Sequence, residues 1–194
     1  MNPIPLVLAS SNDHKIQEIH QILGSEFSLQ GLREFGILEE IEENGNSFRE
    51  NSLIKAQYVF QKTGLNVFSD DSGLEINALG GEPGIYSARY SGTRDMRKNL
   101  QKVLDKMEDQ SDRSARFICV ITLIYKGEIH FFEGILDGKI LLEEKGDGGF
   151  GYDPIFLPRT YSQSFAEMEP ELKNRISHRS LALNQMKSFL LRQY

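Results

Sequence analysis

The sequence predicts an α/β protein in which helices flank a mixed β-sheet. The chain opens with an apolar run, a polar turn and a segment of helical period, which is the pattern of a strand followed by a helix. A second helical segment leads directly into another apolar run. After residue 115, apolar runs instead follow one another across short turns, which favours antiparallel neighbours.

The first half of the chain supplies two strands and two helices. Residues 4–9 read as a buried strand, and residues 14–23 carry apolar side chains at helical spacing. Residues 47–50 have the form of a capping box, so a helix begins there and ends at Gly64. The next strand, at residues 66–68, runs into two adjacent acids and a glycine-rich loop.

The second half begins with a helix and continues with strands. Residues 96–107 form an amphipathic stripe, as in a helix packed on a sheet. Strands are predicted at residues 115–125, 128–136 and 139–143, with turns at 126–127 and 137–138. A last helix is expected from residue 178 to about residue 192. Because no repeat or linker interrupts the pattern, we expect one α/β domain over residues 1–194, with room for two lobes.

Composition narrows the class of protein. The net charge of −6 argues against binding of nucleic-acid polymers, yet leaves room for a few cations around one small anion. Cys119 is the only cysteine, which excludes a disulfide framework or zinc cluster and favours a reducing, cytoplasmic setting. The apolar run at residues 4–9 is too short for a signal peptide or a membrane span, so we expect no membrane association.

The acids Asp70 and Asp71 are the strongest functional signal. Aspartate is rare in strands and costly to bury, so a pair directly after an apolar run needs a metal ion or hydrogen-bond donors. Further acids precede Gly45, namely Glu39, Glu40, Glu42 and Glu43. One or two such carboxylates suit Mg²⁺ bound to phosphates. The alternatives are an Asx-turn for the aspartates and a solvated loop for the glutamates.

A polar loop between the first strand and helix is a candidate phosphate site. Its residues are Ser10, Ser11, Asn12, Asp13, His14 and Lys15. Backbone amides at a helix start attract anions, and Lys15 adds a positive charge. Plain helix capping by Ser or Asn is the alternative. Lys55 is a candidate member of the site formed by the acids described above. The alternative is that Lys55 is an ordinary surface lysine.

Two clusters near the C-terminus suggest a site for a base. Residues 146–154 combine four glycines with Phe150 and Tyr152, so that the backbone can approach a ligand and a ring can stack on it. A flexible hairpin is the alternative. Lys173 and the run at residues 177–179 concentrate hydrogen-bond donors in an acidic protein.

Together these motifs resemble the inosine triphosphate pyrophosphatase (Ham1-like) family. They are Ser-x-Asn-x-x-Lys at 10–15, Asp-Asp-Ser-Gly-Leu at 70–74, Ala-Leu-Gly-Gly-x-Pro-Gly-Ile-Tyr-Ser-Ala-Arg-Tyr at 78–90, Gly-Gly-Phe-Gly-Tyr-Asp-Pro at 148–154 and Ser-His-Arg at 177–179. The resemblance implies an α/β mixed-sheet fold of two lobes around a central cleft, usually a homodimer. It also implies Mg²⁺-dependent hydrolysis of purine nucleoside triphosphates such as ITP, dITP and XTP to the monophosphate and pyrophosphate.

The resemblance assigns a role to each cluster. It makes Asp71 the general base and a metal ligand, with Glu42 as the second ligand of Mg²⁺, although the choice between Glu42 and Glu43 stays open. The loop at residues 10–15 would hold the triphosphate, with Ser11 in place of the family's usual glycine. Other substrate-binding residues are expected at Lys55, Ser72, Phe150, Gly151, Tyr152, Asp153, Lys173, His178 and Arg179.

Donors from Lys173, His178 or Arg179 aimed at a 6-keto oxygen would favour hypoxanthine and xanthine over adenine. The alternative is that His178 and Arg179 clamp phosphates.

Three rival functions remain. A non-catalytic nucleotide-binding regulator would keep the phosphate loop, but the intact acid pair counts against it. The related Maf-like pyrophosphatases prefer pyrimidine or modified nucleotides, whereas the glycine-rich loop and the His-Arg pair favour the purine branch. A phosphotransferase is the third rival.

Overall fold

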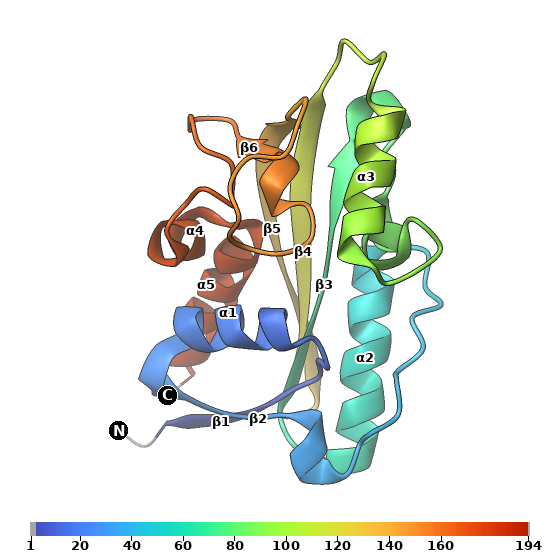
Figure 1. Ribbon diagram of the computed structural model, residues 1–194. Coiled ribbons are helices and arrows are strands. Elements are labelled where there is room, and N and C mark those ends of the chain that lie inside the picture. Colours follow the sequence, from blue (N-terminus) through green and yellow to red (C-terminus); the bar gives the residue numbers. More distant parts are fainter. Residues whose placement is uncertain (1–2, 194) are drawn as a thin grey trace. The chain divides into compact units, whose positions relative to one another are not determined.

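The computed structural model describes residues 3–193 and confirms the predicted fold class (Figure 1). Its strands form one sheet in the order β2-β1-β3-β4-β5-β6. Strand β1 runs parallel to both β2 and β3, whereas β5 and β6 are antiparallel, so the sheet is mixed.

The strands are β1 (Ile4–Leu8), β2 (Phe27–Gln30), β3 (Val67–Ile76), β4 (Ser114–Tyr125), β5 (Glu128–Ile140) and β6 (Phe156–Pro158). The α-helices are α1 (Asp13–Leu23), α2 (Phe48–Thr63), α3 (Met96–Lys106), α4 (Pro170–Ile176) and α5 (His178–Leu191). None of the helices described between residues 3 and 193 has the length and hydropathy needed to cross a membrane.

Contacts divide the chain into two compact units, each made of separate segments. Unit 1 comprises the described residues up to Asp71, then Cys119–Gly134, then the described residues from Arg179 onward. Unit 2 comprises Ser72–Ile118 and Ile135–His178.

Unit 1 has a buried layer on each face of its strands. Side chains alternate between the two faces along a strand, so neighbouring residues belong to different layers. On β3, Phe68 packs with residues of α1 and α5, whereas Val67 packs with Ala56 and Val59 of α2. Helices α1 and α5 therefore cover one face, and α2 covers the other.

Unit 2 has its own core around α3. Leu100, Val103 and Met107 pack against Leu74 of β3 and Phe117 of β4. Asp95 caps the helix by accepting hydrogen bonds from the backbone of Arg97 and Lys98, which satisfies two amides of its first turn. The amphipathic stripe at residues 96–107 is thus a core-packing face, as predicted.

Most elements predicted from periodicity are confirmed, but the turn predicted at residues 137–138 and the separate strand predicted at residues 139–143 are wrong. Strand β5 continues through Gly138, which lies opposite Pro158 of β6. A Cβ at Gly138 would lie 2.5 Å from the Leu157 carbonyl oxygen and 2.5 Å from the Phe156 ring. Gly138 therefore permits the close approach of β6, and its role is packing instead of chain reversal.

Three short elements were not predicted, namely β2, β6 and α4. Strand β3 also extends further than expected. It runs from Val67 to Ile76, so Asp70 and Asp71 lie in the middle of a strand and not at the end of one.

Candidate active site

The alternation of β3 sends its two acids to opposite faces of the sheet. Asp70 follows Phe68 by two residues and shares its face with α1 and α5, while Asp71 shares the face of Val67 and Ser69, on which α2 lies. Both residues are buried, at 1% and 7% exposure. Each acid therefore has its own set of partners within unit 1.

Asp71 meets a buried lysine and a glutamate. Lys55 Nζ lies 3.5 Å from Asp71 Oδ1 and 2.7 Å from Glu43 Oε1. Burial raises the pKa of Asp71 above its usual value, although Lys55 and Lys15 oppose that shift. Burial alone would lower the pKa of Lys55, but Asp71, Glu43 and Asp70 together raise it. Lys55 is thus a charged part of this site, and the surface-lysine alternative is wrong.

The loop that carries Glu43 is tied to the start of α2. Asn51 is fully buried, and its Oδ1 accepts a hydrogen bond from the Gly45 backbone at 2.8 Å. A Cβ on Gly45 would lie 2.6 Å from Glu50 Cβ, so only glycine fits there without a shift. Glu50 also accepts a hydrogen bond from the Asn46 backbone. Asn51 was missed by the sequence reasoning; its place one helical turn before Lys55 is the signal that could have found it.

The residues around Asp71 fit a magnesium ion. Within residues 3–193, Asp71 Oδ2 is buried without a hydrogen-bond partner, which leaves a carboxylate oxygen available to a cation. The described residues contain no cluster of three His, Cys, Asp or Glu side chains able to hold a metal. Such a cage is not required, because Mg²⁺ on a nucleotide keeps several waters and uses one or two carboxylates.

The structure distinguishes the glutamates before Gly45. Glu43 reaches Lys55, whereas Glu42 is exposed. Glu39 lies at the surface, where hydrogen bonds from Tyr58, its own backbone and Lys62 lower its pKa to about 2. The solvated-loop interpretation therefore fits Glu39 and Glu42, while Glu43 is the glutamate beside the buried acid.

Asp70 meets two cations on the other face. Lys15 Nζ lies 3.0 Å from Asp70 Oδ2, and Arg179 Nε lies 3.3 Å from the same oxygen. Arg179 Nη1 also pairs with Glu18 of α1. Asp70 and Glu18 raise the pKa of Arg179 against the opposing effect of burial. Sequence reasoning missed Glu18, although its spacing of three residues from Lys15 on a helix indicates a shared face.

The loop before α1 has the local geometry of a capped helix start. Asn12 Oδ1 accepts a hydrogen bond from the Lys15 backbone at 3.2 Å, and Ser10 Oγ accepts one from the Asn12 backbone. The capping alternative is therefore correct for Asn12. The side chains from Ser11 to His14 are exposed, which leaves this end of the helix open to an anion.

Unit 2 contains a second polar cluster around Asp153. Lys173 Nζ lies 2.6 Å from Asp153 Oδ2, and the Phe150 backbone donates to the same oxygen at 2.7 Å. Lys173 Nζ also lies 4.8 Å from the centre of the Phe150 ring. Gly149 has φ of +71°, and a Cβ there would collide with the Asp153 carboxylate. The glycine-rich loop is thus folded around a buried ion pair and is not a plain hairpin.

The other residues expected at a base have differing surroundings. His178 is 5% exposed, and its ring stacks on Phe117 with 4.6 Å between centres. Tyr152 is buried, and its hydroxyl donates to the Ser87 carbonyl. Phe150, which is half-buried, is therefore the better candidate for stacking. Gly151 takes a positive φ in the same loop, and Ser72 is half-buried on β3.

His178 and Arg179 are neighbours in sequence but belong to different units. His178 belongs to unit 2 with Lys173 and Asp153, whereas Arg179 belongs to unit 1 with Asp70. Unit 1 thus holds the acids, the polar loop, Lys55 and Arg179. Unit 2 holds Ser72, the glycine-rich loop, Lys173 and His178.

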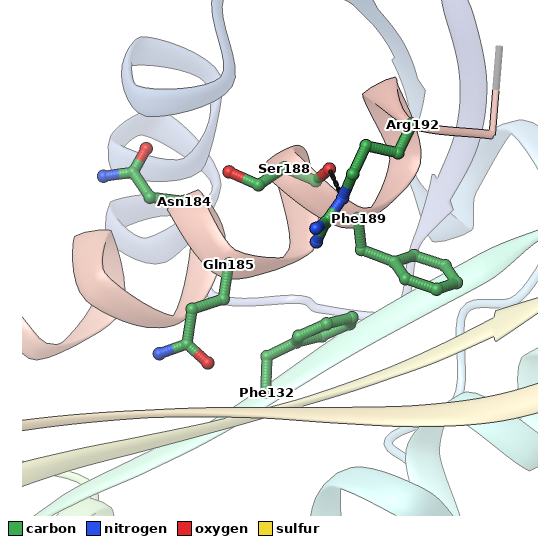
Figure 2. A pocket seen from close by; sticks show the side chains of 6 residues that line it. All are labelled: Phe132, Asn184, Gln185, Ser188, Phe189 and Arg192. Carbon is green, nitrogen blue, oxygen red and sulfur yellow. Dashed lines mark hydrogen bonds between the residues drawn. The ribbon is translucent and has the colours of Figure 1, made fainter.

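One further hollow in unit 1 contains none of these residues. It has a volume of about 490 Å³ and lies between α5 and β5, lined by Phe132, Asn184, Gln185, Ser188, Phe189 and Arg192 (Figure 2). Arg192 Nε donates to the Ser188 carbonyl at its edge. We assign it no part in the site.

A buried carboxylate with a lysine beside it, and a second lysine in the first turn of a helix, are typical of phosphate-handling enzymes. The chain belongs to the Ham1 family, whose model matches residues 6–189. The dITP/XTP pyrophosphatase of Christiangramia forsetii is 44% identical over 186 residues, which cover 95% of this chain and 98% of that protein. The dITP/XTP pyrophosphatase of Porphyromonas gingivalis is 45% identical over 188 residues, covering 96% and 97%.

Solved structures are similar over the same length. The Staphylococcus aureus Ham1 protein has a TM-score of 0.89 at 38% identity, covering 98% of this chain and 100% of that chain. A HAM1 protein from Coxiella burnetii has a TM-score of 0.89 at 40% identity, covering 97% and 99%. The predicted fold class and family are therefore confirmed.

Proposed function

We propose that this protein is a nucleoside triphosphate pyrophosphatase that hydrolyses deaminated purine nucleotides, namely dITP, ITP and XTP. The observation that carries the proposal is Asp71, a buried carboxylate with a raised pKa, one oxygen beside Lys55 and one without a partner in the described chain. Its relatives of about 44% identity are dITP/XTP pyrophosphatases. Removal of such nucleotides from the cellular pool is the role that follows.

Asp71 is suited to be the general base. It takes a proton from a water molecule, the water oxygen forms a bond to the α-phosphorus, and the bond from that phosphorus to the bridging oxygen breaks. Pyrophosphate leaves with the bonding electrons. Asp71 and Glu43 would hold Mg²⁺, which when bound offsets negative charge on the phosphates. Lys55 lies between the carboxylates of Asp71 and Glu43, holds them in place and limits their mutual repulsion.

The start of α1, which carries Lys15, is suited to the phosphates. Lys15 and the backbone amides at the start of α1 stabilise the charge that develops on the leaving pyrophosphate. A phosphate contact of this kind carries no information about the base. Selection must therefore come from another cluster.

The cluster in unit 2 is suited to the base. Phe150 offers a stacking face, while Asp153 fixes the ammonium group of Lys173. Lys173 and His178 are donors that a 6-keto oxygen can accept from, whereas adenine presents an amino group there. Arg179, which already pairs with Asp70 and Glu18, is better suited to holding Asp70 in unit 1 than to recognising the base.

An activity panel tests the function. With magnesium present, we expect dITP, ITP and XTP to yield monophosphate and pyrophosphate far faster than ATP, dTTP or UTP. Identification of the products separates the rivals. Release of orthophosphate or a phosphorylated acceptor would favour a phosphotransferase, a preference for pyrimidine nucleotides would favour a Maf-like enzyme, and no turnover would favour a regulator.

His178→Ala tests recognition of the base. We expect the ratio of kcat/KM for ITP over ATP to fall about fivefold or more, since a buried acceptor loses its donor. His130→Ala is a matched control, because His130 also lies against a phenylalanine, Phe189, at 4.4 Å but belongs to no motif. An unchanged ratio with a general fall in kcat/KM would remove His178 from base recognition.

We also propose a homodimer in the cytoplasm. The homodimer rests on the resemblance to the family. The cytoplasm rests on composition, because the only cysteine lies in the core of unit 1 and forms no internal disulfide. Sedimentation of the purified protein tests the assembly.

A further inference from the structure

Four charged side chains form a network on the α1 face of β3, in which Asp70 and Arg179 are buried and Lys15 and Glu18 are partly exposed. Asp70 Oδ2 forms ion pairs with Lys15 Nζ at 3.0 Å and with Arg179 Nε at 3.3 Å. Arg179 Nη1 also pairs with Glu18. These four side chains carry two positive and two negative charges, which balance one another. Neutrality matters here because a buried charge without a partner is strongly destabilising.

The two cations on Asp70 are held to different degrees. Arg179 has a side chain 3% exposed and contacts two carboxylates, which its planar fork of donors allows. Lys15 has a side chain 15% exposed, and Asp70 is the carboxylate with which it forms a salt bridge. Lysine is a compact charge on a flexible stem. Lys15 can therefore move, while Arg179 is fixed.

The difference in mobility between Lys15 and Arg179 determines whether Asp70 keeps a partner when a triphosphate binds. If Lys15 were the sole partner of Asp70, its transfer to a phosphate would leave a carboxylate with 0% side-chain exposure uncompensated. With Arg179 on the same oxygen, Asp70 stays paired when Lys15 leaves. The second cation makes Lys15 available to substrate.

We propose that Glu18 is a positioning residue that holds Arg179 on Asp70 and thereby releases Lys15 to bind the phosphates of the substrate. The proposal rests on the proposed function only in taking Lys15 as a phosphate ligand. Glu18 touches no reacting atom in this scheme. It acts through Arg179, which acts through Asp70.

A simple charge effect predicts the opposite result. Glu18→Gln removes one negative charge near the loop at residues 10–15, so electrostatics alone would tighten the binding of an anion there. If Glu18 positions Arg179, the same substitution loosens the guanidinium group. Asp70 then retains Lys15, and binding of the anion weakens.

The experiment measures binding of inorganic tripolyphosphate by calorimetry, without turnover. We expect the dissociation constant to rise at least about threefold in Glu18→Gln, within the range of coupling between contacting residues. In a Lys15→Ala background, Glu18→Gln should have no further effect. Glu26→Gln is the matched control, because it removes a carboxylate from the exposed Glu26–Lys187 pair of the same unit.

A kinetic comparison supplies a second readout. With dITP we expect Glu18→Gln to raise KM while kcat stays within about twofold, because Asp71 lies on the other face of β3. Arg179→Lys should give the same pattern, since one ammonium group cannot bridge Asp70 and Glu18 as a fork does. This variant serves if Glu18→Gln does not fold.

Several results would overturn the proposal. Tighter or unchanged binding in Glu18→Gln, an additive loss in the Lys15→Ala background, or no effect of Lys15→Ala itself would each do so. Failure of the proposed function is distinct: wild-type protein would then bind tripolyphosphate through Lys15 but leave dITP intact.

Discussion

Asp71→Asn is expected to lower kcat for dITP by at least about 10²-fold, the usual minimum for loss of a general base. The amide keeps the shape of the carboxylate and removes its ability to accept a proton. Steady-state hydrolysis with magnesium present measures the effect. Asp109→Asn, on an exposed turn, has the same chemical change and should leave the rate unaltered.

The substitution Asp71→Asn should not lower the melting temperature of the protein. Burial raises the pKa of Asp71 in the folded protein, so the folded state binds more protons than the unfolded state between the two pKa values. Stability then falls as pH rises through that window, because ionisation of the buried carboxyl group carries a desolvation penalty. Asn carries no such penalty. Retention of more than about a tenth of the wild-type rate would show that Asp71 is not the base.

Activity should also fall as the pH is lowered. A general base works only when ionised, and burial of Asp71 extends its protonation to higher pH than for an exposed aspartate. The acidic limb of the kcat/KM profile should therefore lie above the usual pKa of aspartate. Binding of magnesium opposes the shift, so the limb should move to lower pH as the metal concentration rises.

Glu43→Gln is expected to raise the magnesium concentration needed for half-maximal activity by about tenfold or more, whereas Glu42→Gln should change it little. Glu43 lies beside Lys55 and Asp71, while Glu42 is exposed one residue away. The two variants have the same charge and length, so each controls for the other. Binding of Mn²⁺ followed by paramagnetic resonance gives a readout independent of turnover.

The reverse outcome would restore the original choice of ligand. If Glu42→Gln weakens binding of Mn²⁺ and Glu43→Gln does not, the loop must rearrange when the metal binds. Equal effects of both variants would show that the loop contributes only its general negative charge.

Periodicity predicted the large elements because their burial is local and regular. Residues 14–23 and 96–107 carry apolar side chains at helical spacing, and the structure places helices over these segments. The turn predicted at Gly138 is wrong because Asp-Gly is a turn signal unless another strand comes close. That approach depends on Phe156 and Leu157, about twenty residues away in sequence, which no local pattern reveals.

The residue types of the candidate site were predictable from the sequence. The division of these residues between the two faces of β3 was not. Motifs identify Asp70, Asp71, Lys15 and Arg179 as polar groups that the fold does not require. Which carboxylate meets which cation depends on the face of β3 from which each projects. The extension of β3 beyond the acids was not foreseen, and so neither was the separation of Asp70 from Asp71.

The register in which β3 pairs with β1 determines the face of the sheet from which each acid projects. Val67 and Phe68 lie opposite Val7 and Leu8, and all four are fully buried in opposite layers. Insertion of one residue between Phe68 and Asp70 would exchange the faces of the acids, whereas insertion of two would restore them. We therefore expect activity to survive insertions at this point only in steps of two residues.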